Sequence, residues 1–109
     1  MAIDYPRAMA AYKVGAEAGD AGSQHQLGCM YYEGQGVDVD FKQARAWIEK
    51  AAAQDDPDAV GELASMHVWG QDATSSWRRA RELYQRSIEL GNEQGVEMMQ
   101  LLNRSIQNV

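Results

Sequence analysis

Residues 21–54 read AGSQHQLGCMYYEGQGVDVDFKQARAWIEKAAAQ. A turn containing Gly34 and Gly36 divides this stretch, and glycine readily adopts the positive backbone dihedrals that a tight turn needs. Apolar residues recur at helical spacing on both sides of the turn, as Leu27 and Tyr31 illustrate before it and Ala44 and Ile48 after it. The stretch therefore predicts two antiparallel helices joined by a short loop.

The same pattern returns along the chain with a period of 36 residues and no gaps. The residues that coincide after this shift include Ala8, Ala44 and Ala80; Tyr12, Ile48 and Tyr84; Tyr5, Phe41 and Trp77; Leu27, Leu63 and Met99; Gly19, Asp55 and Gly91; and Gly34 with Gly70. A fixed period of about 20–50 residues is typical of solenoids built from stacked helical or strand units. The period predicts a stack of helix pairs.

The central repeat also carries a recognisable motif. Its residues are Leu27-Gly28, Tyr31, Gly34, Gly36-Val37, Asp40, Ala44, Trp47 and Lys50-Ala51-Ala52. This motif resembles the Sel-one-like repeat (SLR) family, whose members are relatives of tetratricopeptide repeats. The likeness is weaker in the next repeat, at Leu63-Ala64 and Asp72-Ala73, and faint at Met99-Gln100. The resemblance implies an all-α solenoid, wound as a short right-handed superhelix, that acts by binding other proteins.

We expect one solenoid domain over residues 1–109, with six antiparallel helices that form two full repeats between two half-repeats. The expected helices span about 4–18, 21–33, 40–54, 57–69, 76–90 and 92–105. Asp4, Asp40 and Ser76 precede helices as N-caps. The last helix should close the stack as a terminal cap.

Apolar periodicity also predicts which side chains are buried. The expected core positions are Tyr12, Tyr31, Phe41, Ala44, Trp47, Ile48, Ala51, Ala52, Trp77, Ala80, Leu83, Tyr84, Ile88, Val96, Met99 and Leu102. The acidic turn Asp55-Asp56-Pro57-Asp58 lacks the spacing of a calcium loop, and it is expected to cap the following helix.

The composition excludes several classes of function. The chain has 109 residues, a formal net charge of −6 and one cysteine. An acidic chain lacks the positive footprint of a nucleic-acid binder, although residues 76–109 hold five Arg against four Glu. The net negative charge is compatible with a basic protein partner, and it is equally explained if it serves only to keep the chain soluble. A single thiol forms no internal disulfide, and neither a signal peptide nor a membrane-spanning run is present, so we expect a cytoplasmic location. Separately, we expect a monomer or weak homo-oligomer.

His25 and Cys29 are the one pair of residues whose types and spacing suggest a catalytic or metal-binding site. They lie four residues apart, so a helix places them on one face, with Tyr32 near the same line. Such a pair can form a thiolate nucleophile or supply two metal ligands. No oxyanion stabiliser accompanies it, and one Cys and two His leave a metal site short of ligands. We therefore predict no catalytic residue, no metal and no cofactor.

By analogy with tetratricopeptide repeats, the first helix of each repeat should line a concave groove. The predicted partner-binding residues are Gln24, His25, Cys29, Tyr32, Ser65, Val68, Trp69 and Glu97. Tyr and Trp are frequent anchors at protein interfaces. We predict a non-enzymatic module that binds a partner protein or peptide, with a bacterial antitoxin or immunity protein as the specific hypothesis. The alternatives are a regulatory adaptor, a chaperone, a self-assembling unit, or a thiol- or metal-dependent enzyme that uses His25 and Cys29.

Overall fold

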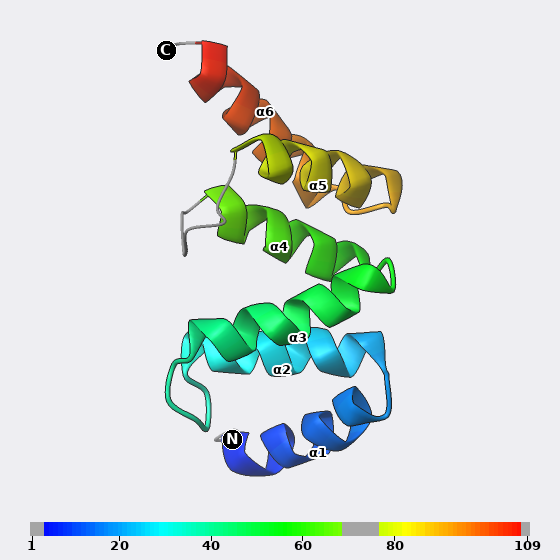
Figure 1. Cartoon of the computed structure of the whole chain (residues 1–109), viewed down its shortest axis with the longest axis vertical. Helices are drawn as coiled ribbons and strands as arrows, with labels where there is room; N and C mark the ends of the chain where they lie inside the picture. Colours follow the sequence, from blue (N-terminus) through cyan, green and yellow to red (C-terminus); the bar gives the residue numbers. More distant parts are fainter. Residues whose placement is uncertain (1–3, 69–76, 108–109) are drawn as a thin grey trace. The chain divides into compact units, whose positions relative to one another are not determined.

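The computed structural model describes residues 4–68 and 77–107, and within these ranges it contains six helices and no strand (Figure 1). The helices are α1 (Tyr5–Glu17), α2 (Ala21–Glu33), α3 (Phe41–Ala53), α4 (Pro57–Val68), α5 (Trp77–Glu89) and α6 (Gln94–Gln107). The expected all-α helical-repeat fold is confirmed. The expected N-cap Ser76 lies outside the described residues.

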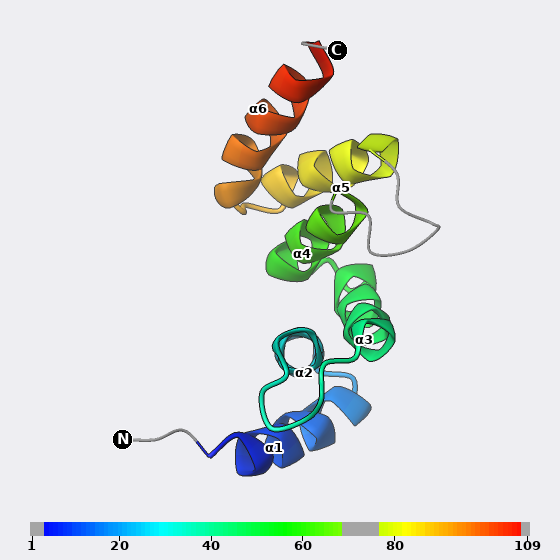
Figure 2. The same cartoon turned by 90° about the vertical axis from the view of Figure 1, so that its left-hand side faces the viewer.

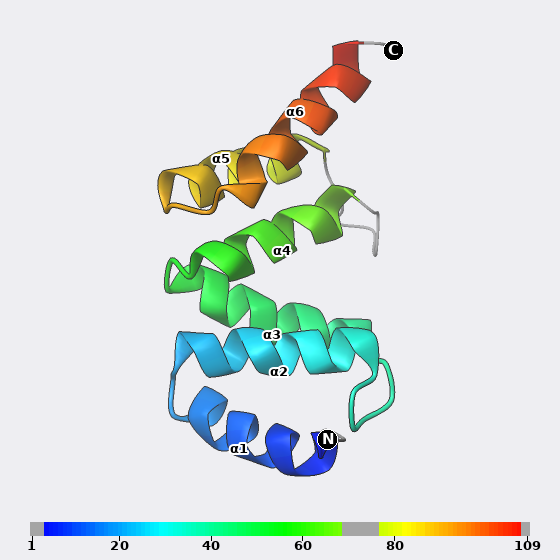
Figure 3. The ribbon, with the colours of Figure 1, turned by 180° about the vertical axis from the view of Figure 1, so that it is seen from behind.

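The chain forms two compact units, Met1–Asp56 and Pro57–Val109. The first unit contains α1, α2 and α3, and the second contains α4, α5 and α6. Each unit therefore holds one complete 36-residue period and one additional helix. Figures 1 and 3 show α3 alongside α2, running in the opposite direction, as the sequence predicts for a repeat.

The first three helices begin in the same way. Asp4, Asp20 and Asp40 precede α1, α2 and α3, and each carboxylate accepts a hydrogen bond from the backbone N–H three residues later, at 3.1, 2.9 and 3.1 Å. Each acid thus satisfies an N–H that has no partner inside its helix. The predicted N-caps Asp4 and Asp40 are confirmed.

The second helix of every period ends in the same way. Gly19, Asp55 and Gly91 follow α1, α3 and α5 by two residues and have φ of 95°, 63° and 100°. Their N–H groups bond to carbonyls three residues earlier, and the next N–H bonds to the carbonyl five residues earlier. This is the Schellman arrangement, which favours glycine at the left-handed position. Asp55 is the only described non-glycine residue with positive φ.

The close approach of α2 and α3 depends on a residue without a side chain. A Cβ on Gly28 would lie 2.7 Å from Ile48 Cδ1 and 3.0 Å from the Ala44 carbonyl oxygen. Leu27 and Ala44 are completely buried and Ile48 is 1 % exposed. The absence of a side chain at Gly28 therefore lets the two backbones pack closely.

A glutamine network joins the three helices of the first unit at one end. Gln24 is buried, and its Nε2 donates to the Ala16 carbonyl at 3.1 Å. Gln54 Nε2 donates to Gln24 Oε1 at 2.9 Å and to the Gly19 carbonyl at 3.0 Å. The other end is the loop from α2 to α3, which extends toward α1 (Figure 2), where a Cβ on Gly36 would lie 2.9 Å from Tyr5.

In the second unit, α5 packs against α4 and α6. Tyr84 is 2 % exposed, and its hydroxyl lies 2.8 Å from Ser65 Oγ. Burial raises the pKa of Tyr84 above its ordinary value; the Ser65 hydrogen bond opposes this change and the negative charge of Glu62 adds to it. Ser87 Oγ and Asn92 Nδ2 both donate to the first-turn carbonyl of α4, at 3.0 and 3.3 Å.

Several core predictions are wrong. Phe41 and Trp77 are 49 % and 48 % exposed because each is the first residue of its helix, where little of the neighbouring helix covers it. Tyr12 is 36 % exposed on α1, which has α2 as its one packed neighbour within the unit, and Val96 is 42 % exposed. Trp47 is half-buried, with Lys50 Nζ 4.4 Å from its ring centre. The side chain of Leu102 lies outside the described residues.

The start of α6 also differs from the expected range. The expected helix began at residue 92, whereas α6 begins at Gln94. Asn92 lies before the helix, where its side-chain Oδ1 accepts a hydrogen bond from the Gln94 N–H at 3.1 Å.

Candidate functional site: a surface at the end of α2

The predicted pair on α2 is brought together. His25 Nε2 and Cys29 Sγ lie 3.5 Å apart, and both side chains are half-buried. A carboxylate oxygen of Asp56, which follows α3, lies within 4.8 Å of a His25 ring nitrogen. The helix turn alone explains the His–Cys contact, because residues four apart are neighbours on a helix surface.

The carboxyl end of α2 presents aromatic surface. Tyr32 is 37 % exposed, and its ring centroid lies 5.3 Å from that of Phe41 with an interplanar angle of 60°. This tilted geometry is favourable for aromatic pairs. Val39, which is 52 % exposed, lies beside this pair in sequence and packs over Gly34. The sequence predicted Tyr32 as a contact residue but assigned Phe41 to the core.

The loop that carries this surface is held in place by backbone hydrogen bonds. The Asp40 N–H donates to the Tyr31 carbonyl at 2.9 Å. The N–H groups of Gly34 and Gln35 both donate to the Met30 carbonyl, at 2.9 and 3.0 Å. The rings therefore sit on a closed, hydrogen-bonded turn.

Two predicted contact residues make hydrogen bonds within the protein. Gln24 is buried and its amide joins the network described above. Ser65 Oγ donates to the Gly61 carbonyl at 3.2 Å and contacts the Tyr84 hydroxyl. Sequence reasoning placed both on a helix face correctly but had no information about the partners that their polar atoms find.

The remaining predicted residues lie in the second unit. Val68 is half-buried at the end of α4, and Glu97 is exposed in the first turn of α6. Trp69 lies outside the described residues. The groove predicted across α2, α4 and α6 stays a prediction, since these helices belong to different units.

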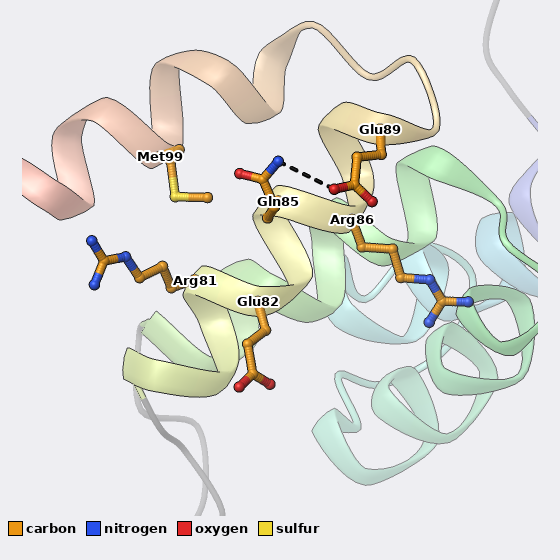
Figure 4. A pocket seen from close by; sticks show the side chains of 6 residues that line it. All are labelled: Arg81, Glu82, Gln85, Arg86, Glu89 and Met99. Carbon is orange, nitrogen blue, oxygen red and sulfur yellow. Dashed lines mark hydrogen bonds between the residues drawn. The ribbon is translucent and has the colours of Figure 1, made fainter.

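A hollow of about 520 Å³ lies against α5 and α6 (Figure 4). The residues that line it are Arg81, Glu82, Gln85, Arg86, Glu89 and Met99. Gln85 Nε2 donates to Glu89 Oε1 at 3.3 Å, and Arg81 and Arg86 point in opposite directions. Charges of both signs alternate here, so the hollow has no single electrostatic preference.

Comparison with known proteins identifies the family. The Sel1 repeat model matches residues 21–56 and 57–92, so the chain belongs to the Sel1 repeat family. These matched segments have the 36-residue length of the period found in the sequence. The family's fold suggests a protein–protein interaction module. A search of curated protein sequences gave no significant match.

Solved structures agree with this assignment. A Sel1 repeat protein from Oxalobacter formigenes is 33 % identical over 90 % of this chain, with a TM-score of 0.86. A protective antigen present in uropathogenic Escherichia coli strains, which displays an SLR fold, is 29 % identical over 88 % of this chain, with a TM-score of 0.83. The present chain spans 40 % and 21 % of the lengths of these proteins. In the described ranges, no helix combines the length and apolarity needed to cross a bilayer.

Proposed function

We propose that this chain is a non-enzymatic module that binds another protein or a peptide through the surface at the end of α2. The exposed Tyr32–Phe41 pair is the observation that carries this proposal, because aromatic side chains on a fixed backbone are typical binding anchors. His25 and Cys29 extend the proposed surface along α2, with Val68 and Glu97 as further proposed contacts.

The specific role that we propose is inhibition of a basic protein, as an antitoxin or immunity protein does in the bacterial cytoplasm. The net charge of −6 supports this role through electrostatic steering of a basic partner. A regulatory adaptor or a chaperone would use the same surface, and the identity of the captured partner distinguishes these roles.

Affinity capture from native-host lysate tests the proposal. The tagged chain is compared with His25→Ala/Tyr32→Ala, and Val14→Ala serves as a matched control because Val14 is 72 % exposed on α1. We expect one stoichiometric partner with the wild type and the control, and its loss with the double variant. Retention of that partner by the folded double variant would refute the proposed surface, and capture of nothing by the wild type would refute the proposed function.

The His25–Cys29 contact favours one alternative, a thiol-dependent enzyme. If His25 activated Cys29 as a thiolate, alkylation by iodoacetamide at neutral pH would slow by about tenfold or more in His25→Ala. We expect similar alkylation rates in both proteins, because the contact follows from helix spacing. A large difference between the rates would support the enzyme.

A further inference from the structure

Two exposed aromatic residues occupy equivalent positions but differ in their charged surroundings. Phe41 and Trp77 lie one period apart, each at the start of its helix, and their exposed fractions are 49 % and 48 %. In the first unit, Asp38 and Asp40 precede Phe41 and Lys42 follows it, whereas Arg78 and Arg79 follow Trp77 in the second. Lys42 is equivalent to Arg78, so the surroundings of Phe41 differ by the two preceding acids and by Gln43 in place of Arg79.

We call the first-unit version, at the end of α2 and the start of α3, the aromatic–acidic patch. It consists of Tyr32, Glu33, Asp38, Val39 and Phe41. The two rings pack against each other at 5.3 Å, and both acids and Val39 are exposed. The patch thus offers ring surface, an aliphatic side chain and two carboxylates within one short, closed turn.

The negative potential of the patch comes from its carboxylates. α2 ends at Glu33 with a partial negative charge and α3 begins at Phe41 with a partial positive charge, so the two helix ends oppose each other. The faces of aromatic rings also attract cations. The chain already shows this attraction elsewhere, where Lys50 Nζ lies 4.4 Å from the centre of the Trp47 ring.

We propose that the aromatic–acidic patch binds an arginine side chain that a partner protein presents next to an apolar residue. The planar guanidinium stacks on a ring while its N–H groups donate to carboxylates, and lysine does not combine both contacts as well. The apolar neighbour packs on Val39. This inference rests on the proposed protein-binding function and specifies what that surface recognises.

A short peptide pair provides a direct test. The tripeptide acetyl-Leu-Arg-Leu-amide is titrated into the full-length, ¹⁵N-labelled chain, and its citrulline analogue supplies the same shape without the charge. We expect chemical-shift changes centred on the amides of residues 32–41, and binding of the arginine peptide about fivefold or more tighter than that of the citrulline peptide. Raising the salt from about 20 to about 300 mM should reduce this preference.

Matched variants separate charge from ring surface. Glu33→Gln/Asp38→Asn should abolish the preference for arginine over citrulline, and Phe41→Leu should weaken binding of the arginine peptide about fivefold while leaving an apolar side chain. Trp77→Leu is the control for Phe41→Leu, because Trp77 is equally exposed but lies outside the patch. Glu17→Gln is the charge control, because Glu17 is an exposed acid outside the patch. Both variants should bind the peptide as the wild type does.

Three outcomes of the peptide titration would overturn the inference: equal binding of the two peptides, shift changes centred on Trp77, or an unchanged arginine preference in the Glu33→Gln/Asp38→Asn variant. These outcomes are independent of lysate capture. A captured partner that stays bound to the Glu33→Gln/Asp38→Asn variant would leave the interaction function standing and refute the arginine site. Failure to capture any protein, together with arginine-selective peptide binding, would refute the interaction function and leave the arginine site standing.

Discussion

At the scale of single residues, the stability of this chain depends on positions where backbone geometry leaves little choice. Gly28 allows α2 and α3 to approach, and three equivalent residues with positive φ end α1, α3 and α5. Two of these three are glycine and the third is Asp55. The first case concerns space and the second concerns backbone conformation, so glycine should be the more stable residue at both kinds of position, for different reasons.

Gly28→Ala should lower the free energy of unfolding by about 1 kcal/mol, because overpacking against Ile48 and the Ala44 carbonyl costs about 1–3 kcal/mol and exceeds a helix-propensity gain of about 1 kcal/mol. Gly22→Ala is the matched control in the same helix, where a new Cβ would approach only Asp20 Oδ2, at 3.6 Å. That change should stabilise the protein. Urea denaturation followed by circular dichroism measures both, and greater stability of Gly28→Ala would contradict the close-approach explanation.

Asp55→Gly should have a free energy of unfolding about 1 kcal/mol higher than Asp55→Ala, because a left-handed conformation costs a residue with a side chain about 1–2 kcal/mol and glycine almost nothing. Asp55→Ala keeps that cost and serves as the control, so it should not stabilise. Thermal melts of the three proteins provide the comparison. If Asp55→Ala stabilised as much as Asp55→Gly, the side chain of Asp55 rather than its φ would be responsible.

At the scale of helices, polar side chains inside each unit fix how neighbouring helices meet. Gln24 and Gln54 bridge the helices of the first unit, and Ser65 with Tyr84 bridges α4 and α5. Two of the residues in these contacts, Gln24 and Ser65, were predicted to face the groove. A buried polar group left without its hydrogen bond costs about 1–3 kcal/mol, so these bridges matter for stability even though they are few.

Tyr84 should make the α4–α5 pair less stable as pH rises in the alkaline range. Burial raises the pKa of Tyr84 in the folded protein above the ordinary 10.0, so folding favours the neutral phenol. This contribution is fully present below pH 10 and is lost as pH rises through the folded-state pKa. Tyr84→Phe should cost about 1 kcal/mol at neutral pH through the lost Ser65 hydrogen bond.

The same variant should also show a shallower loss of stability above pH 10 than the wild type. Urea titrations between pH 8 and pH 11 measure the difference. Tyr12→Phe, which removes a phenol from an exposed ring on α1, is the matched control. Identical alkaline slopes for Tyr84→Phe and the wild type would show that the Tyr84 phenol is not the titrating group.

Much of the fold was predictable from the sequence because it follows from local, repeated signals. The 36-residue period gave the helix pairs, and Asp4 and Asp40 marked helix starts. The exposure of Phe41 and Trp77 was not predictable, since periodicity assigns a residue to a face but does not show how far a neighbouring helix covers the helix end. For the same reason the candidate site was only half predicted: Tyr32 was identified, and its ring partner Phe41 was not.

At the scale of the whole molecule, charge and exposed aromatic surface are unequally shared between the two units. Residues 1–56 carry nine acidic and five basic side chains, and residues 57–109 carry seven and five. The first unit therefore combines the larger negative charge with the Tyr32–Phe41 pair. A basic partner should engage the first unit, and the second unit should contribute less to recognition.

Hydrogen exchange of the captured complex tests this central claim most directly. Amide exchange in the full-length chain is compared by mass spectrometry with and without its captured partner. The account predicts that the partner slows exchange mainly in residues 31–41, at the end of α2 and the start of α3. Protection confined to residues 81–99, around the hollow on α5 and α6, with no change in residues 31–41, would contradict it.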